Sequence, residues 1–390
     1  MKSMKEKVVK FIKNCFWLSS EEGKNSKEIY AFNTMRFFAF FFIFFNHIDA
    51  IFKVSWLQQA KWGVVFFFMI SGFLNGYLNK GVEKINLKSV FAYTKKKMAK
   101  TYPFLLFIIF TMLPRASLFT AKSGGDFLRF LGKIIPGVTL TSSWINDQNH
   151  YFAFFGGIWY MSTFFFLILL TPFLMKIISK TRETKRGVMK LIILSVVMFV
   201  LSMVWTQVMK KNSYYYCYIF PPARLFEYVI GLTWGNLMCY FASTRKNKVK
   251  KHYNKSIIYT VIEAISIIAV ICTMIITTTI PDAKLVGFLS RQSNIYILPT
   301  IIMICVFSKQ QGFFSYLLSM KPLVLLGRAS MYLYLTHQPI LYAMCKLAPA
   351  AKGWFFGFYI LAVCIVISLY LYKNSNKGKK NENSVARVQK

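Results

Sequence analysis

Long apolar runs alternate with short polar segments along the whole chain. A helix that crosses a bilayer needs roughly 20 mostly apolar residues, whereas the strands of a membrane barrel are shorter and alternate in polarity. The pattern therefore predicts an all-α, polytopic integral membrane protein. We assign about ten transmembrane helices, which cover residues 31–52, 62–79, 102–120, 156–178, 188–209, 223–242, 256–280, 292–308, 322–345 and 353–372.

The segments between these spans differ in their positive charge. Lysines and arginines within or beside alternate segments, starting from the N-terminal tail, number 34, against 12 for the other segments. Because cytoplasmic loops carry an excess of Lys and Arg, we expect both termini in the cytoplasm, as an even number of spans requires. The predicted organisation is a basic cytoplasmic tail (1–29), a transmembrane domain (30–372) and a basic disordered cytoplasmic tail (373–390). The first tail either lies on the membrane surface or is disordered.

The longest predicted external segment, about 121–155, is too long for a simple turn and too apolar for a flexible linker. We expect it to re-enter the membrane or to cap an external cavity.

Composition agrees with a membrane protein, since 56% of the residues are hydrophobic and 40 are phenylalanine. A net charge of +36 is also typical of nucleic-acid-binding proteins. Here the cations lie in short clusters between apolar runs, which favours loop topology, and we expect no nucleic-acid partner. The seven cysteines form no CxxC pair and the four histidines are scattered, so neither a disulfide framework nor a metal site is predicted.

A few ionisable residues fall inside the predicted spans, where a charge costs about 2.5–3.5 kcal/mol on insertion scales. Such residues are candidates for function by default. The candidates at membrane depth are Arg36, His47, Arg224, Glu227, Glu263, Arg328 and His337.

Arg36 and His47 bound the stretch "RFFAFFFIFFNH" in the first span. Their separation of eleven residues corresponds to about 1100° of helical rotation, so both point from nearly the same face, about 16 Å apart along the axis. That arrangement suits a polar, protein-lined cavity beside the helix. The alternative is that each side chain reaches its nearer membrane interface.

Arg224 and Glu227 stand at i and i+3 and can pair on one helix face. The pair either holds a span in register or presents the arginine to an anionic or carbonyl group. For His337, a buried ring satisfied by one hydrogen bond is the simpler role.

Several stretches together resemble the membrane-bound acyltransferase 3 family, over about 30–372. The first is "RFFAFFFIFFNH", an Arg, ten residues and a His in the first span. The others, in chain order, are "WGVVFFFMISGFL" (62–74), "TKKKMAKTYP" (94–103), "GIWYMSTFFFLILLTPFL" (157–174), "RLFEYVIG" (224–231) and "LLGRASMYLYLTH" (325–337). In "RLFEYVIG", Tyr228 stands where the family pattern has Phe.

The resemblance implies an acyltransferase that moves acyl groups, often acetyl from acetyl-CoA, to hydroxyls of sugars, glycolipids or other membrane-associated acceptors. It implies catalytic roles for Arg36 and His47. Supporting or substrate-binding roles fall on Ser71, Trp159, Arg224, Glu227 and His337, and acyl-CoA binding on Lys97 and Lys100. The family's basic run is usually Arg-rich, and its lysines here weaken bidentate phosphate recognition.

One mechanism fits this layout. Acyl-CoA docks from the cytoplasm, where segment 80–100 holds seven lysines, although these also fit simple loop topology. Arg36 orients the pantetheine or thioester carbonyl. His47 acts either as general base on the acceptor hydroxyl or as a covalent acyl carrier, with Glu227 as a possible orienting carboxylate.

The expected location is the plasma membrane, with membrane lipid, acyl-CoA and a carbohydrate or glycolipid acceptor as partners. Some family members carry a further extracytoplasmic hydrolase-like domain. None follows the last predicted span, so we expect the transfer to finish within the membrane domain or on a separate protein. The main alternative function is a transporter or exporter of lipid-linked sugar or polysaccharide, and a non-catalytic scaffold is a third. The pattern does not encode the oligomeric state.

Overall fold

The computed structural model describes residues 28–48, 59–78, 85–113, 124–181, 184–209, 214–245, 254–280 and 293–388, with Leu57, Leu285, Gly287 and Leu289. Helices and turns make up this part of the chain and it contains no β-strand, which confirms the predicted all-α class. The chain divides into two compact units. The terminal unit comprises residues 1–60 and 310–390, and the central unit comprises residues 61–309. Nearly all of the predicted tail over 1–29 lies outside the described residues.

Among the described helices, five are long and apolar enough to cross a membrane. They are Ala60–Leu78, Ile158–Ile178, Lys185–Val208, Ile257–Thr279 and Trp354–Ser375. Tyr102–Thr111 and Asn294–Phe307 are shorter apolar helices. Each of the ten predicted spans overlaps at least one helix. The helix with Arg36 and His47 is not among the five, so the number of ten spans stays a prediction.

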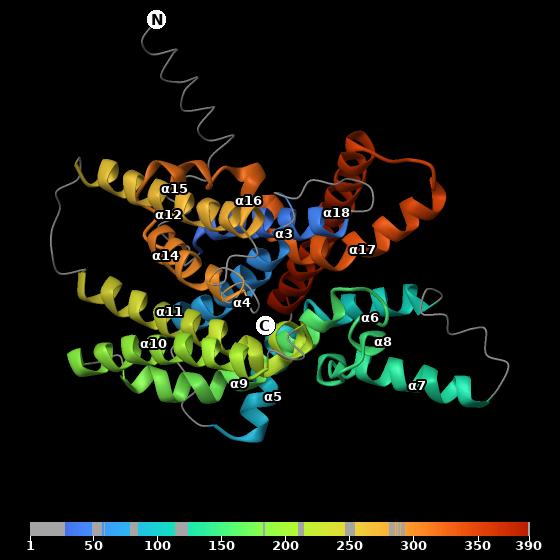
Figure 1. The fold of residues 1–390 in the computed structure, drawn as a ribbon, viewed down its shortest axis with the longest axis horizontal. Coiled ribbons are helices and arrows are strands. Elements are labelled where there is room, and N and C mark those ends of the chain that lie inside the picture. The colour runs from blue at the N-terminus through green and yellow to red at the C-terminus, as the bar shows by residue number, and fades with distance from the viewer. Residues whose placement is uncertain are drawn as a thin grey trace, which may run out of the picture. The chain divides into compact units, whose positions relative to one another are not determined.

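The terminal unit is built around α3 (Tyr30–His47), which packs against α16 (Lys321–Arg328) and α17 (Ser330–Leu347) (Figure 1). The short α15 (Phe313–Leu317) also contacts α3, and α17 packs against α18 (Trp354–Val388). A Cβ added to Gly327 of α16 would lie 1.8 Å from the carbonyl oxygen of Asn33. The backbones of α16 and α3 therefore touch directly at this glycine.

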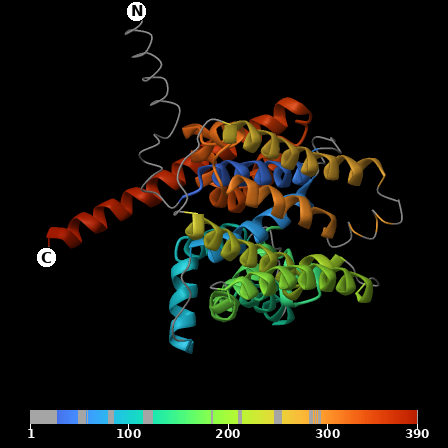
Figure 2. The same cartoon turned by 90° about the vertical axis from the view of Figure 1, so that its left-hand side faces the viewer.

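Two boundaries in the terminal unit differ from the prediction. The predicted span 322–345 is two helices, because α16 ends at Arg328 and α17 begins at Ser330. Arg328 therefore lies at a helix C-terminus, where a cation is favourable, rather than inside a continuous span. The last helix, α18, continues past residue 372 to Val388, over much of the tail that the sequence predicts as disordered (Figure 2). Lysine, which is common there, is a good helix former.

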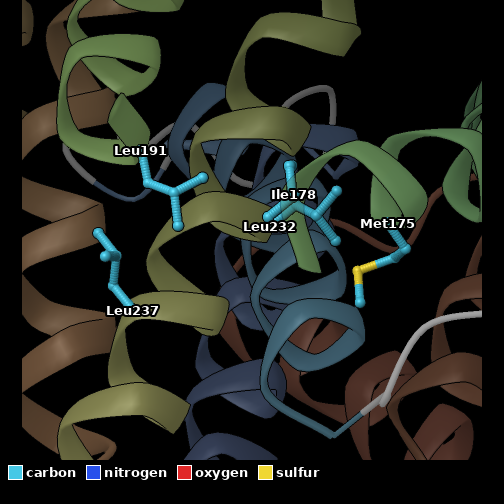
Figure 3. Close-up of a cluster of buried hydrophobic side chains, with 5 residues drawn as sticks. All are labelled: Met175, Ile178, Leu191, Leu232 and Leu237. Carbon is cyan, nitrogen blue, oxygen red and sulfur yellow. The ribbon is translucent and has the colours of Figure 1, made fainter. Parts of the chain in front are cut away.

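In the central unit, α9 (Ile158–Thr181), α10 (Lys185–Val208) and α11 (Leu225–Arg245) lie side by side (Figure 1). Their shared core contains Met175 and Ile178 from α9, Leu191 from α10, and Leu232 and Leu237 from α11 (Figure 3). On the other side, α14 (Ile297–Phe307) packs against both α11 and α12 (Asn254–Thr279). Burial of these apolar faces stabilises the unit at about 25 cal/mol per Å².

The helices α4 (Ala60–Leu78) and α11 cross with their backbones in contact. Each carries two glycines four residues apart. A Cβ on Gly72 or Gly76 would lie 2.1 or 2.2 Å from a carbonyl oxygen of α11, and a Cβ on Gly231 or Gly235 would lie 2.1 Å from a carbonyl oxygen of α4. These four glycines form a reciprocal contact, which we call the glycine seam. It is the close packing that G-x-x-x-G patterns permit between membrane helices.

Two segments between predicted spans are also helical. In segment 80–100, α5 (Leu87–Met98) begins with a capping box in which Asn86 and Ser89 bond each other's backbone N–H groups. In segment 121–155, α7 (Gly124–Val138), the 3-10 turn Ser142–Trp144 and α8 (Gln148–Tyr151) pack together, and the 3-10 turn also packs against α9. Whether this segment re-enters the membrane or caps a cavity stays a prediction.

Candidate functional site

The two predicted catalytic residues lie on one unbroken helix. Arg36 is in the second turn of α3 and half-buried, and His47 is its last residue and exposed. Because α3 has no interruption between them, the helical geometry expected from the sequence applies, with about 16 Å between the two along the axis. They therefore do not touch. A substrate must be extended to contact both Arg36 and His47. Otherwise the two residues line different parts of one cavity.

His337, from α17, lies directly beside His47. The ring centroids of the two histidines are 5.3 Å apart, with 38° between the ring planes. Phe40 packs its ring edge-to-face with His337 at 5.5 Å. The His337 side chain is fully buried, whereas that of His47 is exposed. The structure thus brings together two sequence-predicted site residues from segments almost 300 residues apart.

The hydrogen bonding of His337 fixes the roles of its ring nitrogens. Nδ1 lies 2.6 Å from the carbonyl oxygen of Tyr334, one helical turn earlier. A carbonyl oxygen only accepts, so Nδ1 carries the hydrogen, and Nε2 of the neutral ring is left with a lone pair. Nε2 is buried and has no hydrogen-bond partner among the described residues. The sequence predicts a buried His337 ring that is satisfied by a hydrogen bond. Nδ1 makes such a bond, whereas Nε2 does not.

At the other end of α3, Arg36 belongs to a polar network. Its Nη1 donates to Asn33 Oδ1 at 3.3 Å, and Asn33 Nδ2 donates to Glu28 Oε1 at 2.8 Å. Glu28 also accepts from Arg328, at 3.0 Å from Nε and 2.6 Å from Nη2. Burial raises the pKa of Glu28, but the bonds and charges of Arg328, with Asn33 and Arg36, outweigh it and lower the pKa overall. This network holds the N-terminal turns of α3 against α16.

In the central unit, Arg224 lies where an irregular segment turns into α11. The π-helical turn Tyr215–Ile219 is followed by Phe220 in an extended conformation and by the 3-10 turn Pro221–Arg224. Glu227 is in the first turn of α11, where a negative charge is favourable. Nη1 of Arg224 lies 3.3 Å from Glu227 Oε1. The predicted i, i+3 pair forms, but at a helix start instead of within a span.

An aromatic cage surrounds the guanidinium of Arg224. Its Cζ lies 4.3 Å from the ring centroid of Tyr218, 5.8 Å from Trp159 and 5.9 Å from Phe68. Nε donates to the carbonyl oxygen of Tyr218 at 2.8 Å. The arginine is fully buried, yet Nη2 has no hydrogen-bond partner among the described residues. A buried donor without a partner is costly, so Nη2 is available to a carbonyl, hydroxyl or anionic oxygen.

Two further predicted residues, Ser71 and Trp159, differ in what their side chains do. The Ser71 hydroxyl donates to the carbonyl oxygen of Phe67 at 2.7 Å, within α4. This local bond leaves only the hydroxyl lone pairs for another group. Trp159, at the start of α9, is buried with its ring 5.2 Å from that of Tyr218. It therefore acts as a wall of the aromatic cage.

Of the predicted donor-binding residues, Lys97 lies in the last turn of α5 and Lys100 lies two residues beyond its end, and both side chains reach solvent. Lys97 Nζ donates to Asn75 Oδ1 of α4 at 2.6 Å. Partial burial and the neighbouring Lys96 charge lower the pKa of Lys97. The ammonium group has three hydrogens, so it can hold Asn75 and an anion together.

Asn75 links Lys97 to α11 beside the glycine seam. Its Nδ2 donates to the Tyr228 hydroxyl at 2.8 Å, and that hydroxyl lies 2.6 Å from Thr171 Oγ1. Sequence reasoning missed Asn75, although an amide four residues from the predicted site residue Ser71 in an apolar span was a visible signal. It also missed Tyr218, whose backbone carbonyl accepts from Arg224 and whose ring faces the guanidinium, because no sequence pattern reports either contact. The predicted site residues thus fall into a group in the terminal unit (Arg36, His47, His337) and a group in the central unit (Ser71, Lys97, Lys100, Trp159, Arg224, Glu227).

No group of three or more His, Cys, Asp or Glu side chains within the described ranges is placed to hold a metal ion. A histidine–carboxylate pair does occur in segment 121–155, where His150 Nδ1 lies 2.5 Å from Asp147 Oδ2. Glu263 is fully buried in α12.

Comparison with known proteins adds the family. Residues 29–373 match the family model described as an acyltransferase domain. O-acetyltransferase OatA of Staphylococcus aureus strain NCTC 8325 / PS 47 is 24% identical over 318 residues, which cover 79% of this chain and 49% of that protein. OatA of strains COL and MRSA252 matches with the same identity and coverage. The chain spans about half the length of these curated relatives. No solved structure matches.

The family match covers the whole region over which the sequence resembles the acyltransferase 3 family, so that prediction is confirmed. Together with the apolar helices, it makes the protein a multi-pass membrane protein. The chain belongs to the acyltransferase 3 family.

Proposed function

We propose that this chain transfers an acyl group, with acetyl as the first candidate, from cytoplasmic acyl-CoA to a hydroxyl of a cell-surface or lipid-linked carbohydrate. Family membership and the relatives named O-acetyltransferase support the reaction class. The observation that carries the assignment of the site is the pair of histidine rings, His47 and His337, at the end of α3. Histidine is the side chain best suited to move a proton near neutral pH.

The chemistry at His47 balances as follows. The acceptor hydroxyl oxygen attacks the thioester carbonyl carbon while a nitrogen of His47 takes the hydroxyl proton. A C–O bond forms, the C–S bond breaks, and the CoA thiolate leaves with the proton returned from His47. In the alternative route, the nitrogen itself attacks the thioester carbonyl carbon, the C–S bond breaks and the CoA thiolate leaves. The acceptor hydroxyl then displaces the acyl group from the ring, and its proton passes to the ring nitrogen and on to the thiolate. Both routes need one unprotonated nitrogen of His47 facing the substrates.

The ten-span topology proposed from the charge distribution assigns the two ends of α3 different tasks. Arg36 lies near the cytoplasmic end, where it can donate to the carbonyl or pantetheine oxygens of the donor. His47 lies near the external end, on the side of the acceptor. The Arg224 cage belongs to the external side too, because Trp159 and Arg224 each follow a segment that this topology places outside.

The assignment of His47 is tested by cell-surface chemistry. Cells that carry either the unaltered protein or His47→Ala are compared for ester-linked acetyl, released from surface glycan by mild alkali and quantified. We expect His47→Ala to abolish the ester-linked acetyl that depends on this protein, while the amount of the protein in the membrane stays unchanged. His252→Ala, in a predicted cytoplasmic segment, is the matched control and should leave it intact. Unchanged acetylation in His47→Ala overturns the assignment.

The donor site is tested by binding alone. Acetyl-CoA carries phosphates that Lys97 and Lys100 would meet from the cytoplasm. We expect acetyl-CoA to raise the melting temperature of the purified protein, and the double variant Lys97→Ala, Lys100→Ala to lose most of that increase. Lys88→Ala is the control, because Lys88 is an exposed lysine on the same helix. An equal loss in Lys88→Ala would show that only general charge matters.

A further inference from the structure

We propose that His337 is the positioning residue of the reaction: its Nε2 lone pair accepts the N–H of His47 and so turns the unprotonated nitrogen of His47 toward the substrates. This inference rests on the proposed function and deepens it. It names Nε2 as the atom of His337 that orients His47, and it distinguishes this role from the packing of the same ring against Phe40.

The first step of the argument is that His337 has a single neutral form in this environment. Its Nδ1 is held by the Tyr334 carbonyl, so the hydrogen cannot move to Nε2 without losing a 2.6 Å hydrogen bond. Rotation of the ring is opposed by Phe40, packed edge-to-face against it, and by complete burial of the side chain. Nε2 is therefore a fixed hydrogen-bond acceptor.

The second step is that Nε2 of His337 has no hydrogen-bond donor among the described residues. This nitrogen is buried, and an unsatisfied buried acceptor is destabilising. Such groups in native structures call for an explanation. His47 offers a donor, since its ring centroid is 5.3 Å away and a neutral imidazole carries one N–H.

The third step is what the contact does for the reaction. Hydrogen bonds of a catalytic site are often long before substrate binds and tighten in the complex. When Nε2 of His337 accepts the N–H of His47, the tautomer of His47 is fixed and its other nitrogen keeps the lone pair. After His47 takes the acceptor proton, the same contact stabilises the imidazolium, as the orienting group does in other histidine-based sites.

Two substitutions separate this role from packing. The side-chain oxygen of glutamine can stand near the position of Nε2, so His337→Gln keeps an acceptor there and gives up the bond to Tyr334. The amide of asparagine can stand near Nδ1, so His337→Asn keeps the donor to Tyr334 and gives up the acceptor. We expect His337→Asn to lower kcat on the order of 10²-fold with little change in the acceptor KM, and His337→Gln to retain more of kcat. If Asn is the better replacement, the Nδ1 bond and packing matter, and the proposal is wrong.

A spectroscopic measurement does not depend on turnover. The chain has four histidines, so ¹⁵N-histidine spectra of the protein in lipid nanodiscs can be assigned by single substitutions. We expect His47 to show one dominant tautomer in the unaltered protein and in His337→Gln, and a mixture in His337→Asn. If the tautomer of His47 is the same in all three, the inference fails even where acyl transfer is intact. If transfer is absent while the tautomer responds as expected, the proposed function fails and the coupling of the rings stands.

Discussion

Arg224 is a single residue whose surroundings set its energetics. Its guanidinium is fully buried, paired with Glu227 and stacked on Tyr218. Removing one member of a buried ion pair leaves an uncompensated charge, which costs about 3–5 kcal/mol, whereas removing both charges costs far less. The pair was predictable from its i, i+3 spacing. The cage was not, because Tyr218 and Trp159 come from separate segments that only the fold brings together.

We expect Arg224→Met to lower the unfolding temperature strongly, because it leaves the Glu227 carboxylate buried without its partner. Adding Glu227→Gln to that variant should recover a large part of the loss, since no buried charge remains. Thermal unfolding of the three variants in detergent gives the comparison. If the double variant is no more stable than Arg224→Met, the Arg224–Glu227 pair does not account for the loss.

Glu28 makes stability depend on pH. Its pKa is lowered in the folded chain, chiefly by Arg328, so its contribution is present above the usual value near 4.5 and is lost as pH falls through the folded value. The side chains are about one-third exposed, so solvent screening limits the contribution to about 1 kcal/mol or less. Glu28→Gln should therefore unfold earlier than the unaltered protein at pH 7, and the difference between the two should be smaller at pH 4. An equal difference at both values would contradict this role.

At the scale of helices, periodicity and length located a helix in every predicted span, because apolar length alone dictates that choice in a bilayer. The break between α16 and α17 was missed because "LLGRASMY" contains no proline or charge run that would stop a helix. Gly327 inside it is instead the contact point for α3. The glycine seam did have a signal, since "GFLNG" and "GLTWG" are both G-x-x-x-G sequences in apolar spans.

The seam predicts a sharp contrast between two glycines. Gly72→Ala would put a Cβ 2.1 Å from the Tyr228 carbonyl oxygen, so α4 and α11 must separate, and we expect a loss of about 1–3 kcal/mol. Gly132→Ala in α7 is the matched control, because the nearest atom to its Cβ is 3.9 Å away. It should be neutral, or stabilising by up to about 1 kcal/mol, through higher helix propensity. Denaturant unfolding compares the two; similar losses in both would contradict the seam.

For the whole molecule, the open question is how many times the chain crosses the membrane. Five described helices satisfy a simple apolar criterion, whereas the charge distribution favours ten spans. The difference has a physical origin. The polar residues Asn33 and Arg36 lower the mean hydropathy of α3, although the helix is packed in its unit. Tyr102–Thr111 and Asn294–Phe307 are apolar but short.

Ten spans and five spans make opposite predictions about the chain ends, since an odd number would place them on different sides. We expect fluorescent-protein fusions after residues 183 and 250 to fluoresce, and alkaline phosphatase fusions after residues 212 and 286 to be active. A fluorescent reporter at each terminus should also report the cytoplasm. If two neighbouring fusion points lie on the same side, the span assigned between them does not cross the membrane.

The contact between α4 and α11 has a consequence for the membrane as a barrier. A membrane protein that carries polar side chains between its helices has to do so without opening a leak for ions. Where a Cβ would meet a carbonyl oxygen at 2.1 Å, no water molecule fits between the helices either. The polar chain of Lys97, Asn75, Tyr228 and Thr171 ends against this closed contact. The glycines therefore leave no room for water between α4 and α11, directly beside this chain of polar side chains.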